Sequence, residues 1–262
     1  METWTIANQK GGVGKTTTTV TLAGLLSARG QKTLLVDMDP HGSLTTYLGY
    51  DPDQIESSVY DLYQEDPTSI SGLIRRTNFQ NLDLLPASTA MATLDRQLGS
   101  QQGKGLVLKK ALHQVTAEYQ HVLIDCPPML GVLMVNALAA SEHLIIPVQT
   151  EFLALKGLER MLRSVKMMNH ARSQPLPYTI VPTMFDKRTR ASNQSLQTLK
   201  ERHADTLWDL FIPVDTQFRE ASRAGIPASI MAPHTRGVQA YKALLYNLIV
   251  HKPDQFFNSN IA

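Results

Sequence analysis

Short apolar runs alternate with longer amphipathic stretches along most of this chain. Nearly continuous apolar runs such as 33–36 indicate strands that are buried on both faces of a sheet. The predicted strands lie near residues 3–8, 32–37, 82–86, 121–126, 143–148, 178–183 and 207–212. The predicted helices cover residues 15–29, 104–118, 131–141, 153–170, 191–203 and 235–250. This alternation predicts right-handed βαβ crossovers, and therefore an α/β fold with a mainly parallel, twisted sheet and helices on both faces.

One segment departs from this alternation. Residues 51–80 are polar and irregular apart from a short amphipathic piece at Val59–Tyr63, and they predict a surface excursion or an interface element rather than a domain. We find no internal repeat and no low-complexity linker. A chain of 262 residues can bury one substantial core. We therefore expect residues 1–262 to form a single domain.

Residues 9–17, Gln-Lys-Gly-Gly-Val-Gly-Lys-Thr-Thr, follow the first predicted strand and lead into the first predicted helix. They resemble the phosphate-binding pattern G-x-x-x-x-G-K-[ST], with Gln in place of the first glycine and a second lysine after it. The glycines let the backbone curl around an anion, and the N–H groups of the turn and of the helix N-terminus face the β- and γ-phosphates. The predicted nucleotide-binding residues of this loop are Gly11, Gly12, Val13, Gly14, Lys15, Thr16 and Thr17.

Two lysines and a threonine of this loop have distinct expected roles. Lys15 should reach the β- and γ-phosphate oxygens, and the Thr16 hydroxyl should hold Mg²⁺. Lys10, at the start of the loop, is poorly placed for its own phosphates. It is well placed for the phosphates of a second subunit docked face to face.

Three aspartates stand at the ends of predicted strands. Asp37 and Asp39 end the strand at 32–37, and Asp125 ends the strand at 121–126. The carboxyl ends of parallel strands share one edge of the sheet, so all three should lie beside the phosphate loop. We expect Asp125 to hold Mg²⁺ through water, Asp37 to support the metal shell, and Asp39 to orient water for hydrolysis. The alternative for each is an ordinary strand-end or capping aspartate.

Residues 10–17, followed by Asp37-Met38-Asp39-Pro40, resemble the ParA/MinD family of deviant-Walker ATPases. Further likeness extends over nearly the whole chain, at residues 122–128, 182–190, 212–221 and 237–241. The resemblance implies a P-loop NTPase that binds ATP and Mg²⁺ and forms a sandwich dimer with ATP. It also implies that Lys10 acts in trans, and that Lys10, Lys15 and Asp39 serve a slow hydrolysis stimulated by a partner or adaptor protein.

In this family the ATP dimer binds a surface, either nucleoid DNA or membrane, and positions a cargo. Residues 40–50 begin Pro-His-Gly-Ser, which differs from the commoner Pro-Gln-Gly pattern of chromosome and plasmid ParA proteins. They resemble most the ParC-type ATPases, which place chemotaxis arrays at cell poles. This likeness implies a polar chemotaxis scaffold as the partner, with chromosome or plasmid partition on nucleoid DNA as the alternative.

Two further loops should meet the same edge of the sheet. By resemblance they flank the adenine, which makes Thr183, Pro213 and Asp215 candidates for base contacts through backbone or side chain. The alternative is ordinary turn chemistry at strand ends.

Arginines are densest in residues 187–190 and 218–223. We expect Arg188, Arg190, Arg219 and Arg223 to form a non-specific DNA-binding patch, with solvated arginines paired to acids such as Glu220 as the alternative. The formal net charge of +2 does not decide between these.

Membrane insertion is not expected. No apolar stretch is long enough to span a bilayer, the N-terminus lacks a secretory signal, and the tail at 254–260 has no basic residue to attract anionic lipid. We therefore expect a cytoplasmic protein, located at a pole or on the nucleoid. Phe256 and Phe257 should pack back on the domain or meet a partner.

Two other functions stay open. The first is metabolic, as in relatives that drive electron transfer, cluster assembly or ATP-dependent carboxylation. The lone Cys126 cannot supply the two nearby cysteines that a bridged iron–sulfur cluster needs, which leaves a small-molecule ligase as the remaining metabolic option. The second is a scaffold that binds ATP and hardly hydrolyses it.

Overall fold

The computed structural model describes residues 1–98 and 104–250. Seven strands form one sheet in the order β3-β4-β2-β5-β1-β6-β7. The strands are β1 (Glu2–Ile6), β2 (Thr33–Asp37), β3 (Arg75–Arg76), β4 (Leu82–Leu85), β5 (His121–Asp125), β6 (His143–Gln149) and β7 (Tyr178–Thr183). All neighbouring strands are parallel except β3 and β4. The predicted α/β fold with a mainly parallel sheet is confirmed.

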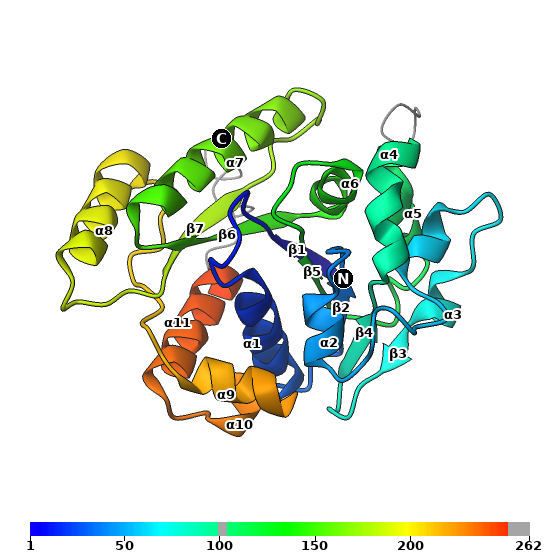
Figure 1. Cartoon of the computed structure of the whole chain (residues 1–262), viewed down its shortest axis with the longest axis horizontal. Helices are drawn as coiled ribbons and strands as arrows, with labels where there is room; N and C mark the ends of the chain where they lie inside the picture. The colour runs from blue at the N-terminus through cyan, green and yellow to red at the C-terminus, as the bar shows by residue number, and fades with distance from the viewer. Residues whose placement is uncertain (99–103, 251–262) are drawn as a thin grey trace, which may run out of the picture.

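Helices lie on both sides of this sheet (Figure 1). The α-helices are α1 (Lys15–Ser27), α2 (Ser43–Tyr47), α3 (Ile70–Leu73), α4 (Leu94–Leu98), α5 (Val107–His113), α6 (Val132–Ala140), α7 (Phe152–Asn169), α8 (Arg190–His203), α9 (Gln217–Ala224), α10 (Ala228–Met231) and α11 (Arg236–Val250). Short 3-10 helices are η1 (Val59–Tyr63), η2 (Thr89–Thr93) and η3 (Lys104–Leu106). Helices α4 to α8 pack on one face, and α1, α2 and α11 pack on the other.

The two cores are separated by the alternation of side chains along each strand. On β2, Leu34 and Val36 point into the core under α4 to α8, and Leu35 points into the core under α1 and α11. All three side chains are fully buried. Burying each such side chain stabilises the fold by about 2 kcal/mol. Burial on both faces explains why the strands are apolar almost throughout.

The register of the sheet brings the predicted acids together. Asp37 at the end of β2 lies directly opposite Asp125 at the end of β5, and Ile6 at the end of β1 is paired with Asp125 on its other side. The loop at 9–17 leaves β1 at this same edge. Three segments far apart in sequence therefore meet at the carboxyl ends of the three central strands.

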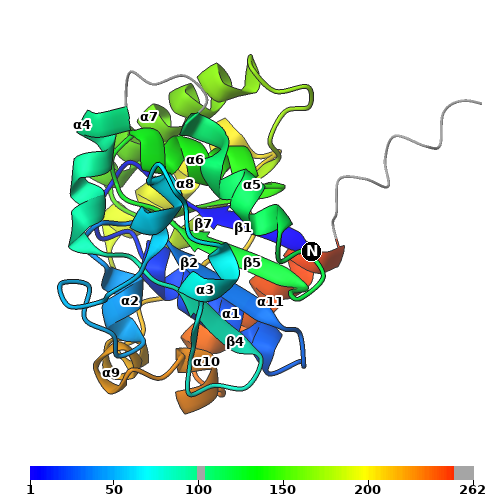
Figure 2. The ribbon, with the colours of Figure 1, turned by 90° about the vertical axis from the view of Figure 1, so that its right-hand side faces the viewer.

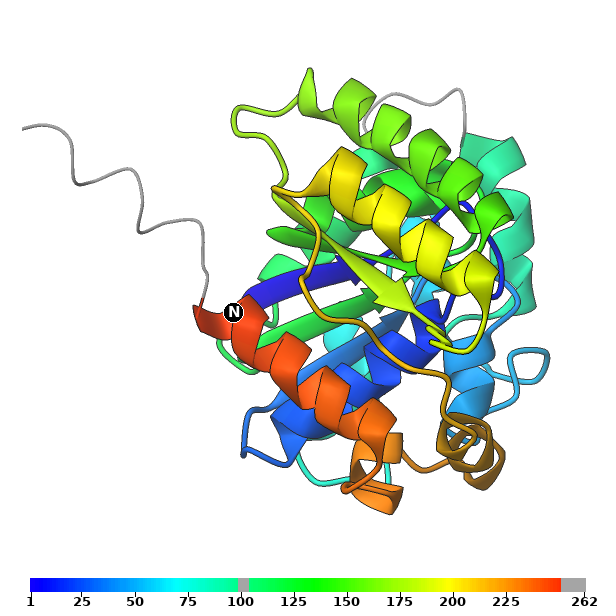
Figure 3. The ribbon, with the colours of Figure 1, turned by 90° about the vertical axis from the view of Figure 1, so that its left-hand side faces the viewer.

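The predicted strand at 207–212 is wrong. Trp208 donates its backbone N–H to Ile180 of β7, and Ile212 donates to Pro182. Four residues of this segment thus span only two residues of β7, so the chain bulges out between the two bonds and forms isolated bridges instead of a ladder. Figure 3 shows this segment running along β7 from α8 towards α9.

Segment 51–80 contributes to the core, which corrects the prediction of a surface excursion. Leu62, Ile70 and Leu73 are buried with the side chains that α4 to α8 cover. Figure 2 views this edge of the sheet, with α3 near β4. Arg75 and Arg76 then form β3, the antiparallel edge strand. Helix α3 and strand β3 are too short to produce a detectable hydrophobic period, whereas the predicted amphipathic piece at Val59–Tyr63 coincides with η1.

Five of the six predicted helices match the structure within two residues at each end. The predicted helix at 104–118 is too long, since α5 ends at His113 and turns follow it. The predictions for the tail at 254–260, including Phe256 and Phe257, lie outside the described residues. Within the described ranges, no helix is both long enough and apolar enough to cross a bilayer.

Candidate functional site

The phosphate loop adopts a conformation that requires glycine. Gly12 has φ 75° and Gly14 has φ 91°, in the left-handed region. Among the described residues, no heavy atom lies within 4 Å of a Cβ placed on Gly12. Glycine is therefore required there for its backbone conformation, and not because a larger side chain would collide with a neighbour. Gly14 is the N-cap of α1, which has 13 residues. The unpaired N–H groups of the first turn of α1 therefore face the loop, as in a phosphate-binding site.

The two lysines of the loop lie close to each other. The Lys15 Nζ donates to the backbone carbonyl of Lys10 at 3.4 Å, and the Lys15 residue is only 9% exposed. This bond holds the Lys15 ammonium against the start of the loop. Lys10 is half-buried at the mouth of the loop.

Helix α7 holds the first residues of the loop in place. The Gln9 amide donates to Ser164 Oγ at 2.7 Å, and Arg160 Nη2 donates to the Gln9 carbonyl at 3.4 Å. A Cβ added to Gly157 would lie 2.7 Å from the Lys10 Cβ, closer than real contacts allow. The position of Lys10 is therefore set by α7, which the linear pattern of the loop does not reveal.

Asp125 and Thr16 form the part of the site that suits a metal ion. The Thr16 hydroxyl donates to Asp125 Oδ2 at 2.5 Å, and the Thr19 hydroxyl lies 3.4 Å from Asp125 Oδ1. Hydroxyl and carboxylate oxygens are ligands that Mg²⁺ accepts. Burial, and then the charge of Asp37, raise the pKa of Asp125 to about 8. A divalent cation here would offset the cost of burying this charge, so the residues fit Mg²⁺.

Asp37 is held by protein donors on both of its oxygens. Oδ2 accepts from the Thr45 backbone N–H at 2.8 Å and from the Thr45 hydroxyl at 2.7 Å, and Oδ1 accepts from the Asp39 N–H at 3.1 Å. Burial raises the pKa of Asp37 to about 6, against the opposing effect of these hydrogen bonds. The arrangement suits a supporting role behind the metal more than direct coordination.

Asp39 is the more accessible carboxylate of this edge, with its side chain 13% exposed. Its Oδ1 accepts from the His41 backbone N–H at 3.0 Å and lies 2.9 Å from His41 Nδ1. His41 itself is 84% exposed. Asp39 thus lies at the border between the buried acids and solvent.

The residues predicted to contact the base have structural partners. The Thr183 hydroxyl is buried and donates to the Val13 carbonyl at 2.8 Å, so it supports the phosphate loop from beneath. Asp215 accepts from the Gln217 N–H and from the Gly237 N–H, both at 3.0 Å. Its side chain therefore ties the start of α9 to the start of α11. Pro213 is half-buried on the segment between them and β7.

The four arginines predicted to bind DNA fall into two classes. Arg188 forms an ion pair with Asp186 at 2.7 Å, and Arg223 forms one with Glu220 at 2.7 Å. Arg190 and Arg219 are exposed. Pairing with nearby acids, the alternative that the sequence left open, therefore holds for two of the four.

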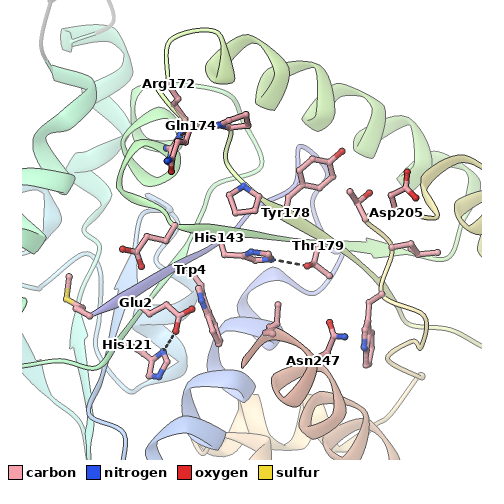
Figure 4. A pocket seen from close by; sticks show the side chains of 18 of the residues that line it. Glu2, Trp4, His121, His143, Arg172, Gln174, Tyr178, Thr179, Asp205 and Asn247 are labelled. Carbon is pink, nitrogen blue, oxygen red and sulfur yellow. Dashed lines mark hydrogen bonds and ion pairs between the residues drawn. The ribbon is translucent and has the colours of Figure 1, made fainter. Parts of the chain in front are cut away.

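A large cavity lies elsewhere, at the amino ends of β1, β6 and β7. Figure 4 shows this groove, which has a volume of about 1400 Å³. At its centre, His143 Nε2 and the Thr179 hydroxyl are hydrogen-bonded at 2.9 Å. Burial lowers the pKa of His143 to about 4. Trp4 and Tyr178 also line the groove. None of the residues predicted to form the site lines it, so the site and the cavity occupy opposite ends of the sheet.

Sequence reasoning missed several residues that shape the site. Thr45 anchors Asp37, and Gly157 and Ser164 of α7 support the loop. Met184 has φ 52°, unusual for a residue with a side chain, and its Cε lies 3.8 Å from a Cβ placed on Gly14. These contacts join positions far apart in the sequence, and no local pattern signals them.

The chain is similar to several known proteins over most of its length. The family model described as an AAA domain matches residues 1–177. Sporulation initiation inhibitor protein Soj from Bacillus subtilis is 38% identical over 237 residues, which cover 90% of this chain and 93% of Soj. Chromosome partitioning protein ParA from Caulobacter vibrioides is 34% identical over 253 residues, covering 95% of this chain and 94% of that protein.

A solved structure of high similarity is cobyrinic acid a,c-diamide synthase from Mycobacterium smegmatis, with a bound ATP analog and magnesium. It aligns with a TM-score of 0.84 and 33% sequence identity, over 96% of this chain and 95% of that chain. The fold, the glycine geometry of the loop, the opposed acids and the similarity to Soj and ParA point the same way. This chain belongs to the ParA/MinD family of P-loop ATPases.

Proposed function

We propose that this protein is an ATP-hydrolysing molecular switch that forms an ATP-dependent sandwich dimer and positions or segregates a cellular cargo. One observation carries the proposal. A phosphate loop with two lysines, Lys10 and Lys15, shares one edge of the sheet with Asp37, Asp39 and Asp125.

Within this proposal, residues 11–17 bind the phosphates of ATP, and Lys15 contacts the β- and γ-phosphates. Thr16 and Asp125 hold Mg²⁺, and Asp37 supports them from behind. The magnesium ion supplies charge neutralisation at the phosphates. Thr183, Pro213 and Asp215 lie on the loops that would flank the adenine. Because the Thr183 hydroxyl and both Asp215 oxygens already have partners, backbone groups are the better candidates for base contacts there.

The dimer depends on Lys10. Its place at the mouth of the loop, fixed by α7, suits contact with the nucleotide of a second copy. Asp39, at the border of the site, would orient the attacking water. We expect slow hydrolysis that a partner or adaptor protein stimulates.

The cargo is the finer part of the proposal. Residues 40–50 resemble the ParC type, which favours chemotaxis arrays at a cell pole and a polar scaffold as the partner. The name of the relative from Caulobacter vibrioides, chromosome partitioning protein ParA, favours the alternative, partition of a chromosome or plasmid on nucleoid DNA. The exposed Arg190 and Arg219 supply charge for such non-specific binding. Fluorescent fusions would decide between a signal that follows chemoreceptor arrays and one that follows the nucleoid.

Size-exclusion chromatography tests the switch. Asp39→Ala with ATP and Mg²⁺ should elute as a dimer and hydrolyse little, because it binds the nucleotide but does not orient the water. Lys10→Ala should bind ATP as a monomer and serve as the matched control. A strict monomer for Asp39→Ala at saturating ATP would refute the sandwich mechanism.

Binding to non-specific duplex DNA tests the surface. The ATP-bound Asp39→Ala dimer should bind, and the affinity should fall steeply with salt because counterions are released. Arg190→Ala and Arg219→Ala should weaken this binding more than Arg188→Ala and Arg223→Ala, whose arginines are already paired. Absence of binding by a confirmed dimer would leave a protein scaffold as the surface.

A second candidate function rests on the similarity to the synthase from M. smegmatis, whose name describes an amide-forming enzyme. A ligase would use ATP to activate a small carboxylate. Phosphate release that depends on an added metabolite, and not on a protein partner or DNA, would favour this candidate over the switch.

A further inference from the structure

The turn after β2 places a histidine against the most accessible acid of the site. Asp39 Oδ1 lies 3.0 Å from the His41 backbone nitrogen and 2.9 Å from His41 Nδ1. Both groups can donate only if the ring carries its proton on Nδ1. No protein donor is bonded to Asp39 Oδ2 among the described residues, so one oxygen is fixed and the other is left to accept a further hydrogen bond.

This turn is held from both sides. The Gly42 N–H donates to the Asp39 carbonyl at 2.8 Å, and Gly42 has φ 61°, which favours glycine. A Cβ on Gly42 would collide with the ring of Pro52. Thr45, just beyond, is bonded to Asp37. The backbone of His41 therefore has little freedom, and its ring is presented to Asp39 by the turn itself.

We infer that His41 is a positioning residue for hydrolysis: it fixes the Asp39 carboxylate so that Oδ2 can accept a hydrogen bond from the attacking water. The inference rests on the proposed function, in which Asp39 orients that water. It adds a residue that the commoner Pro-Gln-Gly pattern lacks, since His41 stands where that pattern has glutamine.

Steady-state ATP turnover at saturating Mg²⁺, over a range of ATP concentrations, tests this inference. At pH 8, His41→Ala should lower kcat about fivefold with little change in KM, the loss expected for one hydrogen bond that orients a reacting group. His41→Gln should keep kcat within about twofold, because its amide donates the same bond.

The control is His170→Gln, an exposed histidine at the far end of α7, which should keep the wild-type kcat and KM. An unchanged kcat in His41→Ala, with Asp39→Ala still inactive, would overturn the role of His41 and leave the proposed function standing. Absence of ATP hydrolysis by the wild-type protein under all conditions would overturn both.

Discussion

The two ends of the sheet bury ionisable side chains with opposite consequences. At the carboxyl end, burial raises the pKa of Asp37 to about 6 and of Asp125 to about 8. At the amino end, burial lowers the pKa of His143 to about 4. The cause is the same, since a buried site disfavours the charged form of any group. The two ends differ in their neighbours: Asp37 and Asp125 lie opposite each other, whereas His143 is neutral and hydrogen-bonded to Thr179.

This contrast between the two ends of the sheet indicates which end requires a ligand. The groove at the amino end has a volume of about 1400 Å³, yet its central histidine is already hydrogen-bonded to Thr179. The carboxyl end has opposed acids whose charges are costly without a cation. Pre-arranged donors and uncompensated charge therefore identify the site here better than cavity volume does. The four predictions below test this contrast, in order of decreasing effect.

Lys15→Gln should give the largest effect, confined to the carboxyl end. Removing the ammonium that faces the phosphates should weaken ATP binding about 1000-fold, or about 4 kcal/mol, because charge-assisted bonds to phosphate are strong. Calorimetric titration with ATP and Mg²⁺ measures it. His143→Gln, at the opposite end, is the matched control and should bind ATP within about twofold of wild type. Equal losses in the two variants would remove the contrast between the ends.

Asp125→Asn should change how stability depends on pH. In the wild-type protein without metal or nucleotide, the folded pKa of Asp125 exceeds the ordinary value of 3.8. The folded state thus binds more protons, and the free energy of unfolding falls as the pH rises from about 4 through 8. In Asp125→Asn, the decrease in the free energy of unfolding between pH 5 and pH 8 should be about 3 kcal/mol smaller than in the wild-type protein. Urea unfolding at pH 5 and pH 8 measures it.

The control for that substitution is Asp205→Asn, an exposed carboxylate on the rim of the groove, which should keep the wild-type dependence. Adding Mg²⁺ with ATP at pH 8 should also restore stability to the wild-type protein. If Asp125→Asn followed the wild-type curve, the two acids would not be the charged pair that requires a cation.

Gly157→Ala should disturb the loop from outside the motif. The added methyl group would meet the Lys10 Cβ at 2.7 Å and Asn8 Oδ1 at 3.3 Å, so α7 or the loop must shift. We expect a loss of about 2 kcal/mol in stability and a weaker ATP-dependent dimer, since overpacking costs this much. Gly72→Ala is the control, because its methyl group meets only Thr68 Cγ2 at 3.5 Å. Thermal unfolding and size-exclusion chromatography measure both effects.

His143→Gln should give the smallest effect, with the opposite pH sign to that of Asp125. The folded pKa of about 4 lies below the ordinary 6.5, so the unfolded chain binds more protons between these values. The stability that neutral His143 contributes is complete above pH 6.5 and is lost as the pH falls towards 4. Between pH 7 and pH 5, wild type should lose about 1 kcal/mol more than His143→Gln in urea unfolding. A loss of the same size in both proteins would contradict the burial of this histidine.

Much of this architecture is predictable from local pattern. Six of the seven predicted strands exist, because a strand buried on both faces is apolar throughout. The phosphate loop and the three acids meet as expected, because strand ends in a parallel sheet share an edge. The seventh predicted strand fails because apolar content alone does not reveal a bulge. The bonds of Trp208 and Ile212 to β7 are needed to see it.

The sequence does not reveal hydrogen bonds between residues that are far apart in the chain. Thr183 bonds to Val13 across 170 positions, and Gln9 bonds to Ser164 across 155. Neither contact has a period, a spacing or a motif. The roles of Lys10 in a dimer and of the arginines on DNA also depend on molecules outside this chain, so these predictions await the experiments above.

Both edges of the sheet are unsuited to recruiting another strand. One edge ends in β3, only two residues long and made of Arg75 and Arg76. The other is β7, whose free side is covered by the bulged segment that follows α8. Short, charged or covered edges prevent chains from joining sheet to sheet. Two copies of this chain are thereby prevented from aggregating by pairing their backbones edge to edge.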